Sequence, residues 1–175
     1  MSQEIHWYTI EQGVKPLLKR RVQRLLQLVV HPADLFLLLR IFLWSLVLPA
    51  LKRVVPVRRL APFLWSKSAR ERTHIQEMKI AAVVRWIYIF IFPGDTSCLQ
   101  RSLLLYRYLS KNNSDPVLVT GMRRTEDQNW KGHAWILVDG KPFGESAATI
   151  QDFQPLITFG TQGIMKQVDS TEPTQ

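Results

Sequence analysis

The sequence predicts an α+β protein, in which a basic, helical N-terminal region packs on a core made of one helix and an antiparallel sheet. Three observations predict this class. Apolar residues in the N-terminal half recur at three- and four-residue spacing, as in amphipathic helices. A Pro-Gly pair at 93–94 is then followed by a second apolar helical stretch. Finally, residues 116–124 and 132–140 alternate as strands do.

The composition is that of a globular protein, with 175 residues, 46% hydrophobic and 21% charged. The net charge of +9 is unevenly placed, because residues 1–97 hold 15 Lys and Arg against 6 Asp and Glu, whereas residues 98–175 hold 8 against 8. The cations alternate with long apolar runs and match no motif that reads bases, so we expect no nucleic-acid partner.

The cysteine count bears on compartment and chemistry. A single cysteine cannot form an intramolecular disulfide, and the opening residues lack the order of a secretory signal, so we expect a cytoplasmic protein. No Cys or His cluster has metal-ligand spacing, and no glycine-rich phosphate loop is present. We therefore expect neither a metal nor a cofactor.

Helices are expected in order along the first half. Residues 14–30 form a basic amphipathic pattern, and 31–51 form an apolar helix that starts at Pro32. Its apolar stretch is too short to span a bilayer and contains Arg40. Prolines 49, 56 and 62 should break the chain that follows, and 68–92 predicts one more helix. Two interpretations of residues 31–62 stay open: a buried helix with a solvated basic turn, or peripheral contact with an anionic membrane surface at the inner face of the membrane.

The cysteine lies in GDTSCLQRSLLLYRYL, residues 94–109. Asp95, Thr96 or Ser97 can cap a helix there, which places Cys98 in its first turn. Outward-pointing backbone N–H groups and the positive end of the helix dipole favour a thiolate at such a position. Cys98 is therefore a candidate nucleophile, although a lone cysteine is more often a small buried hydrophobic residue.

A histidine follows on a predicted strand. We expect His133 at the start of the strand 132–140, with Trp135 and Leu137 on the same face, and we expect Gly121 to allow a close approach in the strand 116–124. A buried helix beginning with cysteine, followed by strands that carry histidine, is the layout of papain-like and transglutaminase-like sites. His133 is thus the candidate base.

An acid should orient the imidazole. Asp139 is six strand residues from His133, about 20 Å, which is too far to reach it. If residues 138–140 form a three-residue loop, Glu145 falls opposite His133 on the returning strand. If 139–140 form a two-residue turn, Glu145 points to the other face. We expect the three-residue loop and Glu145, with another acid such as Asp152 as the alternative.

The stretches CLQRSLLLYRYL, VLVTGMRR and GHAWILVDGKPFGES resemble the transglutaminase-like leader peptidases of lasso-peptide biosynthesis. In that family's pattern a Cys-Leu-x-Arg motif precedes a strand, a His-Ala-Trp segment and an acid, usually Asp. The resemblance implies a transglutaminase-like or papain-like core at 93–165, a helical region at 1–92 and a disordered tail at 166–175. It also implies that the triad is Cys98, His133 and Glu145.

The resemblance further implies a cysteine peptidase that removes the leader of a ribosomally made precursor peptide. We see no leader-recognition segment before Val14, so we expect a separate leader-binding protein as a partner, together with the macrocyclase. Two alternatives stay open: a transglutaminase-like acyltransferase with an amine acceptor, and a non-catalytic interaction or membrane-surface module.

Overall fold

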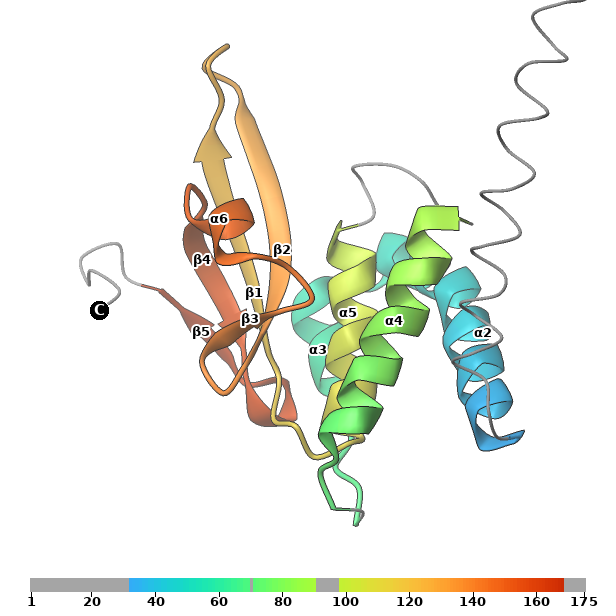
Figure 1. Ribbon diagram of the computed structural model, residues 1–175. Helices are drawn as coiled ribbons and strands as arrows, with labels where there is room; N and C mark the ends of the chain where they lie inside the picture. Colours follow the sequence, from blue (N-terminus) through green and yellow to red (C-terminus); the bar gives the residue numbers. More distant parts are fainter. Residues whose placement is uncertain (1–31, 70, 91–97, 169–175) are drawn as a thin grey trace, which may run out of the picture. The chain divides into compact units, whose positions relative to one another are not determined.

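The computed structural model describes residues 32–69, 71–90 and 98–168 (Figure 1). The chain divides into two units, one up to Arg40 and one from Ile41 onward. The helix expected at 14–30 lies outside the described residues, as do the capping residues before Cys98. The domain boundaries expected from the sequence therefore stay a prediction.

Helix α2 (Pro32–Val54) continues through Pro49, and α3 (Val57–Leu64) contains Pro62. The expected breaks at Pro49 and Pro62 are therefore wrong, because both prolines lie inside helices. A proline removes one backbone donor from a helix. Here α2 continues beyond Pro49 to Val54, and the side chain of Leu48, directly before that proline, is fully buried. The break at Pro56 is confirmed, because that residue separates the two helices.

Helix α4 (His74–Phe90) confirms the helix expected within 68–92, and α5 (Cys98–Ser110) confirms the one expected after the Pro-Gly pair. Most of α5 from Ser102 onward is buried, and the helix contacts α3, α4, β1 and β2. Figure 1 shows α5 against the sheet, with α4 beside it. The apolar residues around most of the circumference of this stretch therefore reflect a helix that is covered on most sides.

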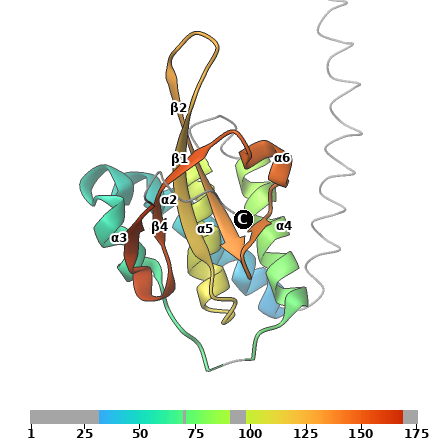
Figure 2. The same cartoon turned by 90° about the vertical axis from the view of Figure 1, so that its left-hand side faces the viewer.

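The sheet has five antiparallel strands in the order β3-β2-β1-β4-β5. Its strands are β1 (Val117–Arg124), β2 (Trp130–Val138), β3 (Lys141–Phe143), β4 (Gln154–Phe159) and β5 (Met165–Gln167). A short helix α6 (Ala147–Ile150) joins β3 to β4, and a 3-10 turn η2 (Thr161–Gly163) joins β4 to β5. The hairpin of β1 and β2 projects beyond the other strands (Figure 2).

The start of the tail expected at 166–175 is ordered as part of a strand. Lys166 and Gln167 belong to β5, whereas the sequence placed them in a disordered tail. They pair with Thr158 and Ile157 of β4, which gives their backbone groups partners that an isolated tail would lack. Residues 169–175 lie outside the described part of the chain.

The two faces of the sheet carry different clusters. Leu118 and Ile136 are register partners and are buried on one face. Val119, Trp135 and Phe153 form a buried cluster on the other, where α6 and the segment after it cover the sheet. The fold is thus α+β, with a cysteine-bearing helix followed by an antiparallel sheet, as the sequence predicts.

The close approach expected at Gly121 is confirmed. A Cβ at this position would lie 2.4 Å from the carbonyl oxygen of Gln154 and 2.9 Å from the Trp135 ring. The pairing of β1 with β4 shifts by one residue between Thr120 and Gly121, and this irregularity brings the two backbones together. Gly121 is the register partner of His133, so the close approach of β4 to β1 lies directly opposite the histidine.

Candidate active site

Cys98 is the first residue that the structure describes in α5, and its side chain is half-buried. The pKa of its thiol is lowered, chiefly by a hydrogen bond with His133. Burial opposes this effect, but the backbone N–H groups of Ala134 and Leu99 add to it. A thiol whose pKa is lowered in this way holds more thiolate at neutral pH, which is the reactive form.

His133 is the fourth residue of β2 and not the first, because β2 begins at Trp130. The strand begins two residues earlier than expected, because Trp130 and Lys131 already pair with Arg124 and Arg123 of β1. Its imidazole centroid lies 6.0 Å from that of Trp135 in a stacked arrangement, and 5.0 Å from that of Phe153. These two rings limit the orientations that the imidazole can adopt.

The imidazole connects the thiol to a carboxylate. Nε2 of His133 lies 2.7 Å from Oε2 of Glu145, and the two side chains are only 15% and 10% exposed. The pKa of His133 is raised to about 9, first by the hydrogen bond with Cys98 and then by that with Glu145. A cationic imidazole between two anionic partners is consistent with a thiolate–imidazolium pair.

The predicted contact between Glu145 and His133 is present, but the register argument behind it is wrong. Val138 pairs with Lys141, so Asp139 and Gly140 form a two-residue turn, with φ values of 53° and 74°. Asp-Gly is a favoured sequence for such a turn, because both positions need a positive φ. Continued pairing in this register would have turned Glu145 away from His133.

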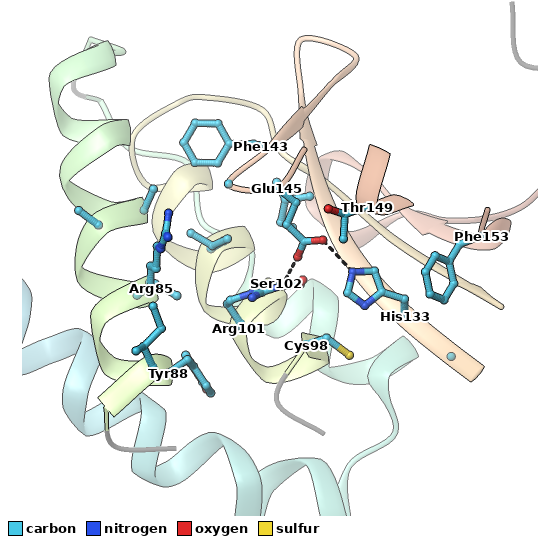
Figure 3. Close-up of a pocket in the computed structure, with 18 of the residues that line it drawn as sticks. Arg85, Tyr88, Cys98, Arg101, Ser102, His133, Phe143, Glu145, Thr149 and Phe153 are labelled. Atoms are coloured by element: carbon cyan, nitrogen blue, oxygen red, sulfur yellow. Dashed lines mark hydrogen bonds and ion pairs between the residues drawn. The ribbon is translucent and has the colours of Figure 1, made fainter. Parts of the chain in front are cut away.

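Glu145 reaches the imidazole because the strand ends before it. The ladder of β3 stops at Phe143, and Gly144 has a φ of +79°, which redirects the chain. Glu145 then lies in the bend after β3, where strand alternation no longer decides its direction. In Figure 3 its carboxylate points toward both His133 and Arg101.

Arg101 is a site residue that the sequence analysis did not single out. Its Nη2 forms an ion pair with Oε1 of Glu145, so the two carboxylate oxygens have different partners. Burial would raise the pKa of Glu145, but the hydrogen bond from His133 and the charge of Arg101 outweigh it and lower that pKa. The signal was present in CLQRSL, since Arg101 lies one helical turn after Cys98 on α5.

Two further contacts position the helix and the hairpin. Ser102 of α5 donates a hydrogen bond of 2.8 Å to the carbonyl oxygen of Ala134, which joins the start of the helix to the strand residue after His133. At the far end of β2, both oxygens of Asp139 accept hydrogen bonds from Arg72, at 2.8 and 2.6 Å. Asp139 is therefore a turn residue that also anchors the hairpin, remote from the imidazole. Asp152, the alternative acid, lies 3.6 Å from Arg123 instead.

The described residues contain no group of three or more His, Cys, Asp or Glu side chains arranged to hold a metal ion. What they do contain is a nucleophile candidate at a helix start, an imidazole on a strand and a half-buried acid in one connected row. That arrangement defines the class of cysteine-dependent acyl-transfer sites.

The comparisons with known proteins agree with this class. The sequence model of the transglutaminase-like superfamily matches residues 39–158, which is more than half of the chain. The chain belongs to the transglutaminase-like superfamily, whose members are in general cysteine peptidases and acyltransferases. No curated protein and no solved structure matches it significantly.

Proposed function

We propose that the protein is a cysteine peptidase that hydrolyses a peptide bond through an acyl-enzyme. The observation that carries this proposal is the connected row of Cys98, His133 and Glu145, with the pKa of the thiol lowered and that of the imidazole raised. A structural cysteine has no need of a cationic imidazole held by a half-buried carboxylate.

In the proposed mechanism the Cys98 thiolate attacks the scissile carbonyl carbon and forms a tetrahedral intermediate. The backbone N–H of Cys98 at the helix start is proposed to stabilise the oxyanion. His133 then protonates the leaving amine, and the neutral imidazole takes a proton from the water that hydrolyses the thioester. Glu145 holds the imidazole in one tautomer, and Arg101 keeps Glu145 ionised and in place.

For the substrate, we propose the leader-bearing precursor of a lasso peptide, cleaved in the cytoplasm. The support is the sequence resemblance around Cys98, His133 and Glu145 to the leader peptidases of that pathway. A separate leader-binding protein would deliver the precursor, and the macrocyclase would receive the product. Incubating candidate precursors with the protein, with and without these partners, and weighing the products by mass spectrometry tests the proposal.

The second candidate function is amine transfer, which the superfamily favours because it includes acyltransferases. An amine-transferring enzyme would form the same thioester but would resolve it with an amine instead of water. Adding a primary amine such as glycine ethyl ester distinguishes the two. A peptidase yields the free acid. An acyltransferase yields the amide, whose mass exceeds that of the free acid by the mass of the amine less the mass of one water molecule.

We also propose that part of the helical region contacts an anionic membrane surface. The sequence suggested that this apolar stretch is too short to span a bilayer, and this expectation is wrong for α2 as a whole. The helix has 23 residues and is long and apolar enough to cross a membrane by length and composition, a test that core helices of soluble proteins also pass. Large apolar side chains are exposed at Leu43, Leu46, Val47, Val54 and Phe63, and the same stretch of sequence holds the cations Lys52, Arg53, Arg58 and Arg59. Such a surface suits interfacial binding. Cosedimentation with vesicles of anionic but not of neutral lipid is expected.

A further inference from the structure

The edge of β2 beside Cys98 is only partly covered by β3. Strand β3 pairs with residues 136–138 of β2 and ends at Phe143, whereas β1 pairs with the other side of β2 from Trp130 to Leu137. In the order β3-β2-β1-β4-β5, no further described strand lies next to the edge that β3 leaves open. The β1–β2 hairpin also projects beyond the other strands (Figure 2). The first half of β2 therefore has one paired side and one side without a neighbouring strand.

The backbone groups of Ala134 show which residues of β2 face this edge. The N–H of Ala134 forms a hydrogen bond with the Cys98 sulfur, and its carbonyl oxygen accepts one of 2.8 Å from Ser102. In a strand, the N–H and C=O of one residue point to the same side, and those of its neighbours point to the other side. Gly132, two residues before Ala134, therefore directs its N–H and C=O to the same edge. The two residues are roughly 7 Å apart along the strand.

The backbone of Gly132 is open to the site. The residue is exposed, and it lines the same cavity of about 1030 Å³ as Cys98 and His133. No hydrogen bond from the described helices, loops or side chains reaches its backbone. Its N–H and its C=O are therefore both available to an extended peptide that enters the cavity.

The fold itself does not require a glycine at position 132. A Cβ there would meet only the carbonyl oxygen of Gly121, at 3.9 Å, which is ordinary contact, and Gly132 is not among the glycines with a positive φ. The pairing of β1 with β2 keeps one register throughout, so β2 has no bulge at this point. Apart from bulges and bends, a glycine inside a strand marks a place where a ligand or another backbone approaches closely. The approach of a substrate backbone accounts for the residue.

The triad decides which part of a substrate lies on this edge. The leaving amine must reach the His133 ring, which lies beside the ring of Phe153 on one face of the sheet. The acyl part stays bonded to Cys98, whose sulfur lies at the edge next to the N–H of Ala134. In one direction from there the edge is occupied by β3. The acyl part can therefore pair with β2 only in the other direction, toward Gly132.

We propose that the acyl part of the substrate peptide, N-terminal to the cleaved bond, binds in extended form as an added strand on the open edge of β2, where the N–H and C=O of Gly132 form hydrogen bonds with its backbone. This inference rests on the proposed peptidase function, because it assigns the substrate-binding part of that same site. The paired peptide residue lies about two residues from the cleaved bond, since Gly132 and Ala134 are that far apart. Such recognition depends on the peptide backbone more than on the side chain at the paired position.

A vinyl sulfone of acetylated tetra-alanine tests the proposal without a natural substrate. The Cys98 thiolate adds to its vinyl group, and the resulting carbanion takes a proton from solvent, so the product is a stable thioether. In a comparison series each amide in turn is replaced by an ester, which removes one N–H without adding bulk. We expect one ester, or two at alternate positions, to slow the modification of Cys98 about 3- to 10-fold, the effect of one lost hydrogen bond. Esters at the neighbouring positions should have little effect, because successive residues of a strand point to opposite sides.

The variant Gly132→Pro tests the protein side of the same contact. Proline removes the N–H that faces the open edge but leaves the bonds to β1 in place, because those come from the neighbouring residues. The rate with the tetra-alanine compound, divided by the rate with iodoacetamide, should fall about 3- to 10-fold. Gly132→Ala is the matched variant that keeps the N–H, and its ratio should fall clearly less. If circular dichroism shows that Gly132→Pro does not fold, the ester series on the wild-type protein decides alone.

The outcomes separate this inference from the function on which it rests. Esters that all react as fast as the parent compound, together with an unchanged ratio in a folded Gly132→Pro, would overturn the added strand while leaving the triad intact. A rate with methyl vinyl sulfone, which has no peptide, equal to that with the tetra-alanine compound would overturn it as well. A Cys98 that resists even iodoacetamide at neutral pH would instead contradict the proposed peptidase.

Discussion

Arg101 and Glu145 form an ion pair that joins the first turns of α5 to the bend after β3. The same carboxylate contacts His133, so one helix supplies both the nucleophile candidate and the group that holds the acid. The site is in effect a row of four residues, in which Arg101 positions Glu145, and Glu145 orients the imidazole beside Cys98.

Arg101 should therefore matter for activity although it does not contact the reacting atoms. We expect Arg101→Gln to lower kcat/KM about 10- to 100-fold, because a displaced carboxylate misplaces the imidazole. Arg101→Lys should recover part of the loss, since lysine keeps the charge but not the planar fork. The loss of this cation should also let Glu145 protonate at higher pH, which moves the acidic limb of the pH profile upward. An unchanged profile would show that Arg101 is merely structural.

Glu145 should be far more important than Asp139. Glu145→Gln leaves the nucleophile and base in place but frees the imidazole to take the wrong tautomer, and comparable losses in serine-protease triads are about four orders of magnitude in kcat. Asp139→Asn should retain near-normal activity, because asparagine tolerates the positive φ of this turn and only the exposed contact with Arg72 is lost. The reverse ranking in steady-state assays would refute the proposed roles.

The pH dependence of hydrolysis should be bell-shaped. Activity requires the Cys98 thiolate, which forms below the usual pH of a thiol because its pKa is lowered, and the His133 imidazolium, whose pKa is about 9. The alkaline limb should therefore fall near pH 9. His133 also stabilises the folded state fully below about pH 6.5, its unfolded pKa, and this contribution is lost as the pH rises through about 9. An alkaline limb near pH 6.5 would contradict the ion pair.

Gly121 should be intolerant of a side chain. In Gly121→Ala the added Cβ meets the backbone oxygen of Gln154, which cannot turn away as a flexible side chain could. We expect a loss of about 1–3 kcal/mol in the free energy of unfolding, measured by urea denaturation. Gly132→Ala is a matched control on the partner strand, because its Cβ has only one neighbour within 4 Å, at 3.9 Å. Equal losses in both variants would show that the close approach is not the cause.

Sequence patterns predicted the elements around the site because those patterns are local. Cys98 follows a helix-breaking pair, and the alternation in 116–124 and 132–140 marks two strands. The position of Glu145 could not be derived in the same way. It depends on the length of one turn and on the point where β3 ends, and neither is determined by periodicity.

Local sequence patterns also did not predict the continuation of α2 through Pro49 or the ion pair between Arg101 and Glu145. A single proline removes one backbone donor, which does not by itself end a helix. The ion pair depends on a residue distant in sequence, because the bend after β3 brings Glu145 to α5. The three- and four-residue spacing of apolar side chains indicates a helix but says nothing about which polar residue on it meets a partner 44 residues away.

The most direct test compares the wild-type protein with Cys98→Ala on the same precursor peptide in the presence of its partners. Replacing one sulfur at a helix start removes little packing, so circular dichroism and the thermal midpoint should stay close to those of the wild type. Mass spectrometry should then detect the leader and the free core peptide only with the wild-type protein. Cleavage by a folded Cys98→Ala variant would contradict the claim that Cys98 is the nucleophile of a peptidase.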